Sequence, residues 1–310
     1  MLLGVVVTTK VTSPQDAAGD ARIAALFSAE SMAAYRSEPG FDDCARQVAE
    51  SFVALYRDNR LLNLVVNDQG RMVIGWFVIS LHSEGGEGLT VSRIAALCEM
   101  HGICSAGRAA AIIGLMRATG YLVPAPAAGD RRQRRLVPTE RLLTFQWSRW
   151  RAILEALRPM RPHAAEALAA IGDPAFDRAF VGDLFDHFSW GFRFYRTTPE
   201  LAELNRRKAA VLVLFSLFLA RQTGSDGRSY ARLSVSELAR RFQVSRVHVI
   251  KVLREAQDKD LIRRGATEGD PVLITARLID VMGRFLACCM LLLDHCSRRA
   301  LEISARRSAA

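Results

Sequence analysis

Lysine and arginine gather in two short segments of this 310-residue chain, where their charge is suited to binding a polyanion. Residues 103–142 hold seven Lys or Arg against two Asp or Glu, and residues 230–264 hold nine against four. Each segment therefore has a net charge of +5, and together they account for the whole formal charge of +10. Positive charge localised in this way is typical of a surface that binds nucleic acid.

The first basic segment ends in a run of arginines that follows a loop of Pro, Gly and Ala residues. A strand-like stretch, Tyr121–Val123, precedes the loop, and Leu136–Val137 returns from it, which predicts a β-hairpin with a basic tip. Guanidinium groups favour phosphates and narrow minor grooves, so we expect the tip to contact DNA. Such a run on its own is also typical of a solvated loop. The four arginines are Arg131, Arg132, Arg134 and Arg135.

The second basic segment predicts a helix capped by Ser245. Apolar residues at helical spacing, such as Val249 and Val252, form an inward stripe and leave the basic residues near the outer face. The major groove admits one helix and displays hydrogen-bond donors and acceptors, so this face is expected to read base edges. A solvated helix face is the alternative. The expected contacts are Ser245, Arg246, His248, Lys251 and Arg254.

Both basic segments follow the same pattern, LTVSRIAALC from Leu89 and LSVSELARRF from Leu233, at an offset of 144 residues. Ser105 and Ser245 then begin stretches that match at an offset of 140, which indicates a duplicated unit. Ser and Thr are good helix N-caps, so each copy predicts a helix-turn-helix. The change of offset is expected in the turn, EMHGIC in the first copy and QV in the second. In the first copy only Ser105 and Arg108 are expected to contact DNA near the helix start.

A second hairpin is predicted over residues 261–275, with an acidic rather than basic tip. The fold class expected is mainly α with small β-hairpin wings, in which tandem winged helix-turn-helix modules sit in a helical framework. The expected divisions are an N-terminal helical region 1–86, a first winged helix 87–142, an aromatic-rich connector 143–200, a second winged helix with its leading helix 201–276, and a C-terminal helix 277–310.

Residues 89–142 resemble the winged helix of the multiple-antibiotic-resistance-regulator (MarR) family of transcriptional regulators. In that family the wing carries an Asp-x-Arg element followed by a Leu-Thr-like return. Asp130, Arg132 and Thr139 stand at these positions, while Pro138 replaces the usual apolar residue. The resemblance implies that Arg132 enters a minor groove and that Asp130 braces the wing. Such regulators usually have one winged helix per chain and about half this length, and the second module, 231–276, resembles winged helices only in general.

The C-terminal stretch 276–305 reads as one long helix containing the apolar run FLACCMLLL. This run must be covered by the helical core or by a second subunit. A homodimer through terminal helices would fit the MarR resemblance. A monomer acting as a pseudo-dimer is the alternative, because the duplication already supplies two DNA-reading units.

Residues 176–195 contain eight of the 24 aromatic residues of the chain. They could line a pocket for a small-molecule effector, as the resemblance allows, or form a packed joint between the modules. A packed joint is favoured, because aromatic side chains dominate ordinary protein cores.

The chain lacks a phosphate-binding glycine loop, a nucleophile elbow and a paired metal motif, so we expect no enzyme and no cofactor. Cys98, His101 and Cys104 are spaced like metal ligands, but structural zinc sites usually show a second pair, and no metal site is predicted. The apolar runs are too short to span a membrane, and no cationic stretch precedes the first of them, so a cytoplasmic location is expected.

Together these features favour a sequence-specific transcriptional regulator that binds double-stranded DNA through two winged-helix modules. A plasmid-type replication initiator also uses tandem winged helices, and a non-catalytic protein-docking scaffold is a further alternative.

Overall fold

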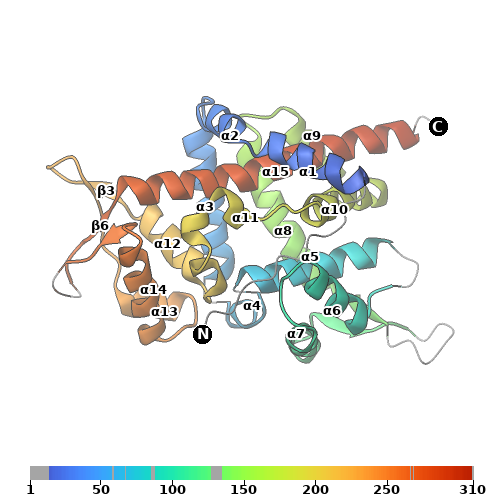
Figure 1. Cartoon of the computed structure of the whole chain (residues 1–310), viewed down its shortest axis with the longest axis horizontal. Coiled ribbons are helices and arrows are strands. Elements are labelled where there is room, and N and C mark those ends of the chain that lie inside the picture. Colours follow the sequence, from blue (N-terminus) through green and yellow to red (C-terminus); the bar gives the residue numbers. More distant parts are fainter. Residues whose placement is uncertain are drawn as a thin grey trace.

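The computed structural model describes residues 14–57, 59–66, 68–84, 88–126, 135–265, 267 and 269–308, and the fold is mainly helical with two small antiparallel sheets. The long C-terminal helix α15 (Ala276–Ser308) crosses the molecule (Figure 1). A group of short helices with a hairpin lies toward each end of α15, on the same side of it.

The first half of the chain contains α1 (Pro14–Leu26), α2 (Ala29–Arg36), α3 (Phe41–Tyr56), α4 (Arg60–Val65), α5 (Gln69–Glu84), α6 (Val91–Met100), α7 (Ala106–Ala118), β1 (Leu122–Pro124), β2 (Leu136–Pro138), α8 (Glu140–Leu157) and α9 (His163–Ala170). The second half contains α10 (Pro174–Ser189), α11 (Phe194–Thr197), the 3-10 turns η1 (Pro199–Leu201) and η2 (Leu204–Arg206), α12 (Ala210–Leu219), β3 (Gln222–Thr223), β4 (Ser229–Ala231), α13 (Val235–Arg241), α14 (Arg246–Asp258), β5 (Ile262–Arg263), β6 (Val272–Ile274) and α15.

The predicted repeat is visible in the backbone. Helices α7 and α14 each have 13 residues and begin where the sequence predicts, after Ser105 and Ser245. Each serine hydroxyl accepts a hydrogen bond from the backbone N–H three residues later, which satisfies a donor that the helix itself leaves unpaired. Both helices are followed by a residue with left-handed backbone, Gly120 with φ 73° and Asp260 with φ 54°.

The length difference between the two copies lies mainly in a helix, not in the turn. Helix α6 has 10 residues whereas α13 has seven, because Cys98, Glu99 and Met100 continue α6. The prediction that the turn absorbs all four extra residues is therefore wrong. Glu and Met are good helix formers, so α6 ends only where Gly102, with φ 63°, can take the left-handed conformation.

A threonine ties each hairpin to the end of the preceding helix. The Thr139 hydroxyl donates to the Gly120 carbonyl over 2.8 Å, and the Thr275 hydroxyl donates to the Asp260 carbonyl over 2.9 Å. Both threonines stand just before a long helix, α8 or α15. The repeat therefore continues beyond the hairpins to the start of these helices.

The two sheets differ in size. Strands β1 and β2 form one hairpin, whereas the second sheet has four strands in the order β3-β4-β6-β5. The β3–β4 hairpin was not predicted from the sequence. Its turn is built by Gly227, with φ 76°, and by Asp226, whose carboxylate accepts hydrogen bonds from the Arg228 N–H and the Tyr230 hydroxyl.

The two halves are joined by helices that pack against both of them. Helix α3 packs against α8 of its own half and against α12 of the other, while α10 packs against α15 of its own half and against α5 of the other. The apolar middle of α15, including the fully buried Leu286 and Met290, is covered by helices of the same chain. Its burial therefore needs no second subunit. No helix in the described part of the chain has the length and apolarity needed to cross a membrane.

The aromatic residues around α10 form a packed joint. Phe176 and Phe180 stack 5.8 Å apart, and Phe180 also packs against Trp150 of α8. Phe188 contacts Phe77 of α5, with ring centroids 5.4 Å apart. These rings are buried, and they join the connector to both halves of the chain.

Candidate nucleic-acid interface

The second helices of the two units lie on the same side of the molecule. Figure 1 shows α7 and α14 on the side away from α15, with the two hairpins toward opposite ends. Both helices bury one face and expose the other, since Ala109 and Val249 are fully buried whereas Arg108 and Lys251 are exposed. The molecule therefore presents two exposed helix faces on one side.

The exposed face of α14 carries most of the side chains predicted from the sequence. Four of the five are exposed: Ser245, Arg246, Lys251 and Arg254. His248 differs, because its ring is half-buried and its Nε2 lies 2.8 Å from the carbonyl oxygen of Lys208. The His248 ring therefore already has one hydrogen-bond partner at this surface, and its contact with DNA stays a prediction.

Sequence reasoning missed an apolar element on the same face. Val247 is 62% exposed, and Ile250 beside it on the helix is half-buried. An exposed β-branched side chain next to basic residues can contact a thymine methyl group in a major groove. The signal available in the sequence was position alone, because Val247 lies three and four residues before Ile250 and Lys251.

A basic segment also lies beside each second helix, and neither was predicted. Arg206 and Lys208 are exposed at the end of η2 and just after it, and η2 contacts α14. Arg57 and Arg60 are exposed at the start of α4, which contacts α7. The runs NRRK and YRDNR were readable in the sequence, but their placement next to α7 and α14 depends on the tertiary fold.

The exposed face of α7 is small and weakly charged. Ser105 and Arg108 are exposed as predicted, but most of the other exposed positions are Gly or Ala. Glu99 of α6 accepts a hydrogen bond from the Ala106 N–H over 3.1 Å, which holds a carboxylate at the start of α7. This face offers fewer groups for reading base edges than α14 does.

The hairpins are described to different extents. Asp130, Arg131, Arg132 and Arg134 lie outside the described residues, while Arg135 is exposed at the base of the first hairpin. In the second hairpin the Arg263 guanidinium lies 3.4 Å from the Asp260 carboxylate, so part of its charge is already balanced.

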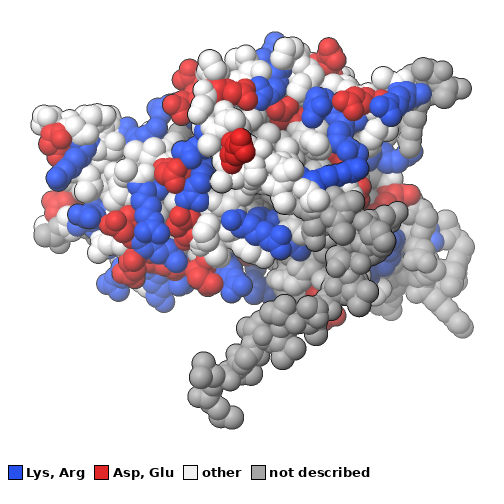
Figure 2. Space-filling model, turned by 45° about the horizontal axis from the view of Figure 1, so that its top comes forward, with Lys and Arg blue, Asp and Glu red and all other residues white. Residues whose placement is uncertain are grey.

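The face that carries α15 has a different charge pattern. Figure 2, which brings the top of Figure 1 forward, shows basic and acidic side chains interspersed over the visible surface. Ion pairs explain part of this pattern, since Arg36 pairs with Asp280 at 2.8 Å and Arg284 pairs with Glu200 at 2.8 Å. Balanced charge of this kind gives little attraction for a polyanion.

A partly open cavity of about 110 Å³ lies where the two halves meet. Its wall is mostly apolar and comes from α3, α5, α8, α12 and α15, with Phe52, Trp76 and Phe285 among the aromatic side chains. Of the aromatic cluster predicted as a pocket or a joint, only Phe194 reaches this wall. The cavity and the packed joint are therefore separate features.

Arg149 of α8 lines this cavity and is only 4% exposed. Neither Nη atom makes a hydrogen bond of good geometry in the described chain, although the guanidinium interacts with the Tyr56 hydroxyl on the same wall and lies 5.5 Å from the centre of the Trp76 ring. Burial lowers the pKa of Arg149, but an arginine stays protonated at neutral pH. Three more buried donors on the wall lack partners: the indole N–H groups of Trp76 and Trp150 and the amide of Asn205.

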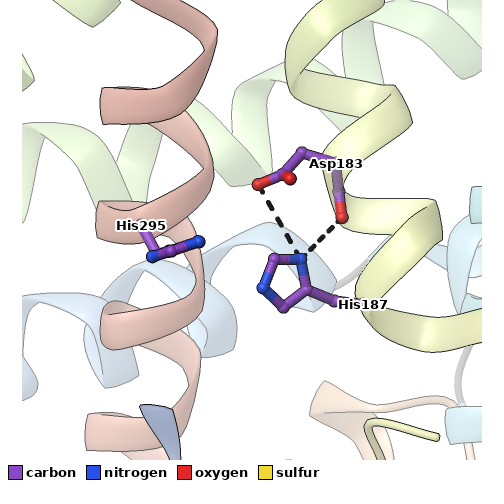
Figure 3. Close-up of side chains that lie close together, drawn as sticks. All are labelled: Asp183, His187 and His295. Atoms are coloured by element: carbon purple, nitrogen blue, oxygen red, sulfur yellow. Dashed lines mark hydrogen bonds and ion pairs between the residues drawn. The ribbon is translucent and has the colours of Figure 1, made fainter. Parts of the chain in front are cut away.

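A buried cluster with metal-binding side chains lies elsewhere, between α10 and α15 (Figure 3). Asp183, His187 and His295 each offer one ligand atom, and these atoms lie within 4.8 Å of one another. This cluster was not predicted from the sequence, because His295 comes from the far end of the chain. Burial, with a contribution from His187, lowers the pKa of His295 to about 4, so this ring is neutral at neutral pH.

The Cys98, His101 and Cys104 triplet has another environment. The His101 ring packs against aromatic rings, 5.7 Å from Phe77 and 5.6 Å from Phe188. Burial and the neighbouring Cys104 raise the pKa of Cys98 to about 12. Cys98 is therefore a protonated thiol at neutral pH, whereas metal ions bind the thiolate.

Comparison with family models, with curated proteins and with solved structures finds no match to this chain.

Proposed function

We propose that this chain is a DNA-binding transcriptional regulator in which a shared helical core holds two winged-helix modules. The first module is α6, α7 and the β1–β2 hairpin, and the second is α13, α14 and the β5–β6 hairpin. The observation that carries the proposal is the repetition of this unit, with equal second helices exposed on one side. Such a helix suits the major groove, and a hairpin beside it suits the neighbouring backbone or minor groove.

The modules would divide the work of binding. In the second, Arg246, Lys251 and Val247 offer the donors and the apolar contact that distinguish base pairs. The first offers few such groups on α7, so its arginine-rich hairpin would supply phosphate and minor-groove contacts, as the MarR resemblance implies. Contacts to the DNA backbone and to base edges account for the exposed groups of both modules, and no catalytic step is needed to explain them.

A single chain would act as a pseudo-dimer. Helices α3 and α10 each pack against both halves and so fix the modules relative to each other. The apolar part of α15 is already buried. Two modules in one chain would then bind two half-sites without a homodimer. Sedimentation analysis of the protein with a labelled duplex tests this, and the expected stoichiometry is one chain for each pair of half-sites.

The main test selects bound sequences from random duplex DNA and repeats the selection at two salt concentrations. An enriched, imperfect inverted repeat with salt-sensitive affinity supports a regulator. Enriched direct repeats would favour the replication initiator. Absence of both enrichment and salt-sensitive binding would contradict DNA binding and leave the docking scaffold.

We further propose that the cavity around Arg149 holds a small-molecule effector. A buried cation without a counterion is costly, and buried donors without acceptors add to that cost. Arg149, Trp76 and Trp150 together would be satisfied by a carboxylate whose apolar body fills the rest of the cavity. The effector class is therefore an organic anion with an apolar, ring-sized body.

The location of the cavity connects the effector to DNA binding. Helices α5 and α12 lead into the first and second modules, and both line the cavity together with α8 and α15. A ligand that binds one relative placement of these helices more tightly would shift the spacing of α7 and α14. The expected consequence is a change in affinity for DNA when the cavity is filled.

Calorimetric titration with benzoate, 1-naphthoate and the neutral benzamide tests this effector class. The carboxylates are expected to bind and benzamide is not, and Arg149→Met should weaken carboxylate binding by at least about tenfold. Arg151→Met removes an exposed arginine from the same helix and serves as the matched control. Equal binding of acid and amide, or full binding by Arg149→Met, would contradict the proposal.

A further inference from the structure

We propose that Asp183, His187 and His295 bind a divalent transition-metal ion that cross-links α10 to α15, with Zn²⁺ as the ion to test. This inference is independent of DNA binding and of the effector cavity. It rests on the kinds of ligand that meet at this point, on their hydrogen bonds, and on their burial.

The three side chains form a suitable ligand set for such an ion. Two imidazoles and one carboxylate recur at protein zinc and iron sites. Asp183 and His187 are four residues apart, so they share one face of α10, and His295 approaches from α15 (Figure 3). Ligands of a tetrahedral ion lie about 3.3 Å apart, so side-chain rotations that bring the three atoms together from within 4.8 Å would complete the site.

The hydrogen bonds around the cluster orient the ligands. The Nδ1 of His187 lies 2.7 Å from the carbonyl oxygen of Asp183, which makes Nδ1–H the donor and leaves the lone pair on Nε2. A histidine that binds a metal through one nitrogen usually donates the other N–H to such a carbonyl. Figure 3 shows the second ring nitrogen of His187 on the side that faces His295.

The carboxylate of Asp183 is only partly satisfied by protein groups. Arg299 lies 3.0 Å from Oδ1, whereas Oδ2 is buried, makes no hydrogen bond in the described chain and lies 3.7 Å from His187 Nδ1. A buried carboxylate oxygen without a partner is costly, and a metal ion would satisfy it. Arg299 would then support Asp183 from outside the metal's own ligand shell, as hydrogen bonds to ligating carboxylates commonly do.

The neighbouring thiol is not part of the proposed ligand set. Cys296 Sγ lies 4.0 Å from His187 Nδ1, which is the nitrogen that already makes a hydrogen bond. Asp183 supplies one oxygen, and the two histidines supply one nitrogen each, so a water molecule would complete four-coordination.

The ion would join two helices that are each connected to one module. Helix α10 packs against α5, which leads into the first helix-turn-helix, and α15 follows the hairpin of the second. Metal binding is therefore expected to raise the unfolding temperature of the full chain, since a ligand that binds only the folded state stabilises it.

The experiment measures Zn²⁺ binding by the purified full chain after chelator treatment and dialysis. One equivalent of zinc is expected, and His295→Gln should weaken zinc binding at least about 100-fold. His295 is the ligand to change because it is half-buried, whereas Asp183 and His187 are buried. His163→Gln is the matched control, because it removes a half-buried histidine that pairs with Asp294, next to His295 in sequence. Zinc binding that is absent, or that survives unchanged in His295→Gln, would overturn the proposal.

Substitution with Co²⁺ supplies a second readout that does not depend on the variants. Visible bands of four- or five-coordinate Co²⁺ without sulfur-to-cobalt charge transfer are expected. A charge-transfer band would show that a cysteine binds the ion and would overturn this ligand set. Neither measurement uses DNA, so failure here and failure of the proposed regulator are distinguishable.

Discussion

Each of the two repeated units is stabilised by the same set of internal hydrogen bonds. Ser105 and Ser245 cap equivalent helices, and Thr139 and Thr275 donate to equivalent carbonyl groups. The outward faces differ. Helix α14 exposes Arg246, Lys251 and Arg254, whereas α7 exposes mostly Gly and Ala, and the four hairpin arginines occur only in the first unit.

This difference shows which positions can change independently. Caps and hairpin ties satisfy backbone groups that the helix ends leave unpaired, so a substitution there costs stability in either unit. Exposed side chains are not needed to satisfy the backbone, so each unit can carry different exposed groups on the same backbone. Under the proposed function, one unit reads sequence mainly by its helix and the other holds DNA mainly by its hairpin.

The largest effect is expected from the hairpin arginines. Changing Arg131, Arg132, Arg134 and Arg135 to Ala should weaken DNA binding by about 100-fold or more and flatten the dependence of log affinity on log salt by about 3 to 4, since each lost phosphate contact contributes about 0.9. Titrations at several salt concentrations measure both quantities. An equal loss from Arg263→Ala and Arg264→Ala in the second hairpin would break the proposed asymmetry.

A smaller but more specific effect is expected from the helix faces. Lys251→Ala with Arg254→Ala should cost about 1–3 kcal/mol per lost base contact and relax the preferred sequence on one half-site. Arg108→Ala with Arg117→Ala on α7 should weaken binding to all sequences alike. Repeating the selection with both double variants distinguishes these outcomes. If the two variants select the same sequences, the proposed difference between α14 and α7 is contradicted.

The shared hairpin ties should contribute similarly to stability, with a somewhat larger contribution from Thr275, because its hydroxyl also accepts a hydrogen bond from the Leu278 N–H. Thr139→Val and Thr275→Val each remove a hydroxyl that donates to a carbonyl of the preceding helix, so each should lower the free energy of unfolding by about 1 kcal/mol. Urea denaturation of the two variants measures this. Costs that differ by more than about 1 kcal/mol would show that the ties are equivalent only in geometry.

The smallest effect concerns the hairpin that only the second unit has. Hydrogen bonds from the Tyr230 hydroxyl and the Arg228 N–H lower the pKa of Asp226. Because the folded form favours the carboxylate, its contribution is present above the usual aspartate pKa of about 4 and is lost as the pH falls through the lowered value. Amide chemical shifts of β3 and β4 should report this loss, and Asp226→Asn should show the low-pH shifts at neutral pH. Chemical shifts in β1 and β2 that followed the same titration would assign it to another group.

Local patterns in the sequence predicted a substantial part of the fold. The starts of α7 and α14 were correct because a serine cap acts over three residues, and apolar spacing identified their buried faces. The hairpins were predicted from turn residues and strand-like runs that are equally local. The turn length was wrong, since Glu99 and Met100 carry no signal that separates the end of a helix from the start of a turn.

The candidate sites depended much more on distant contacts. Arg149 looks like any other helical arginine in the run WSRWRAIL, and only the packing of α3, α5, α12 and α15 around α8 buries it without a carboxylate partner in the described chain. His187 and Asp183 share one helix, but His295 joins them from the far end of the chain. Helical periodicity placed His248 near the outer face, but only the tertiary structure shows that its Nε2 lies 2.8 Å from the carbonyl oxygen of Lys208.

The sequence by itself determined the duplication, the helix caps and the concentration of positive charge in two segments, because these depend on residue type and on spacing of a few residues. Only the tertiary structure decided that α7 and α14 lie on one side, that each has a second basic segment beside it, and that a buried arginine and a buried histidine–carboxylate cluster exist. The physical reason is that burial and ligand geometry depend on how the helices of the two halves pack against one another. No local sequence pattern predicts which helices will be in contact.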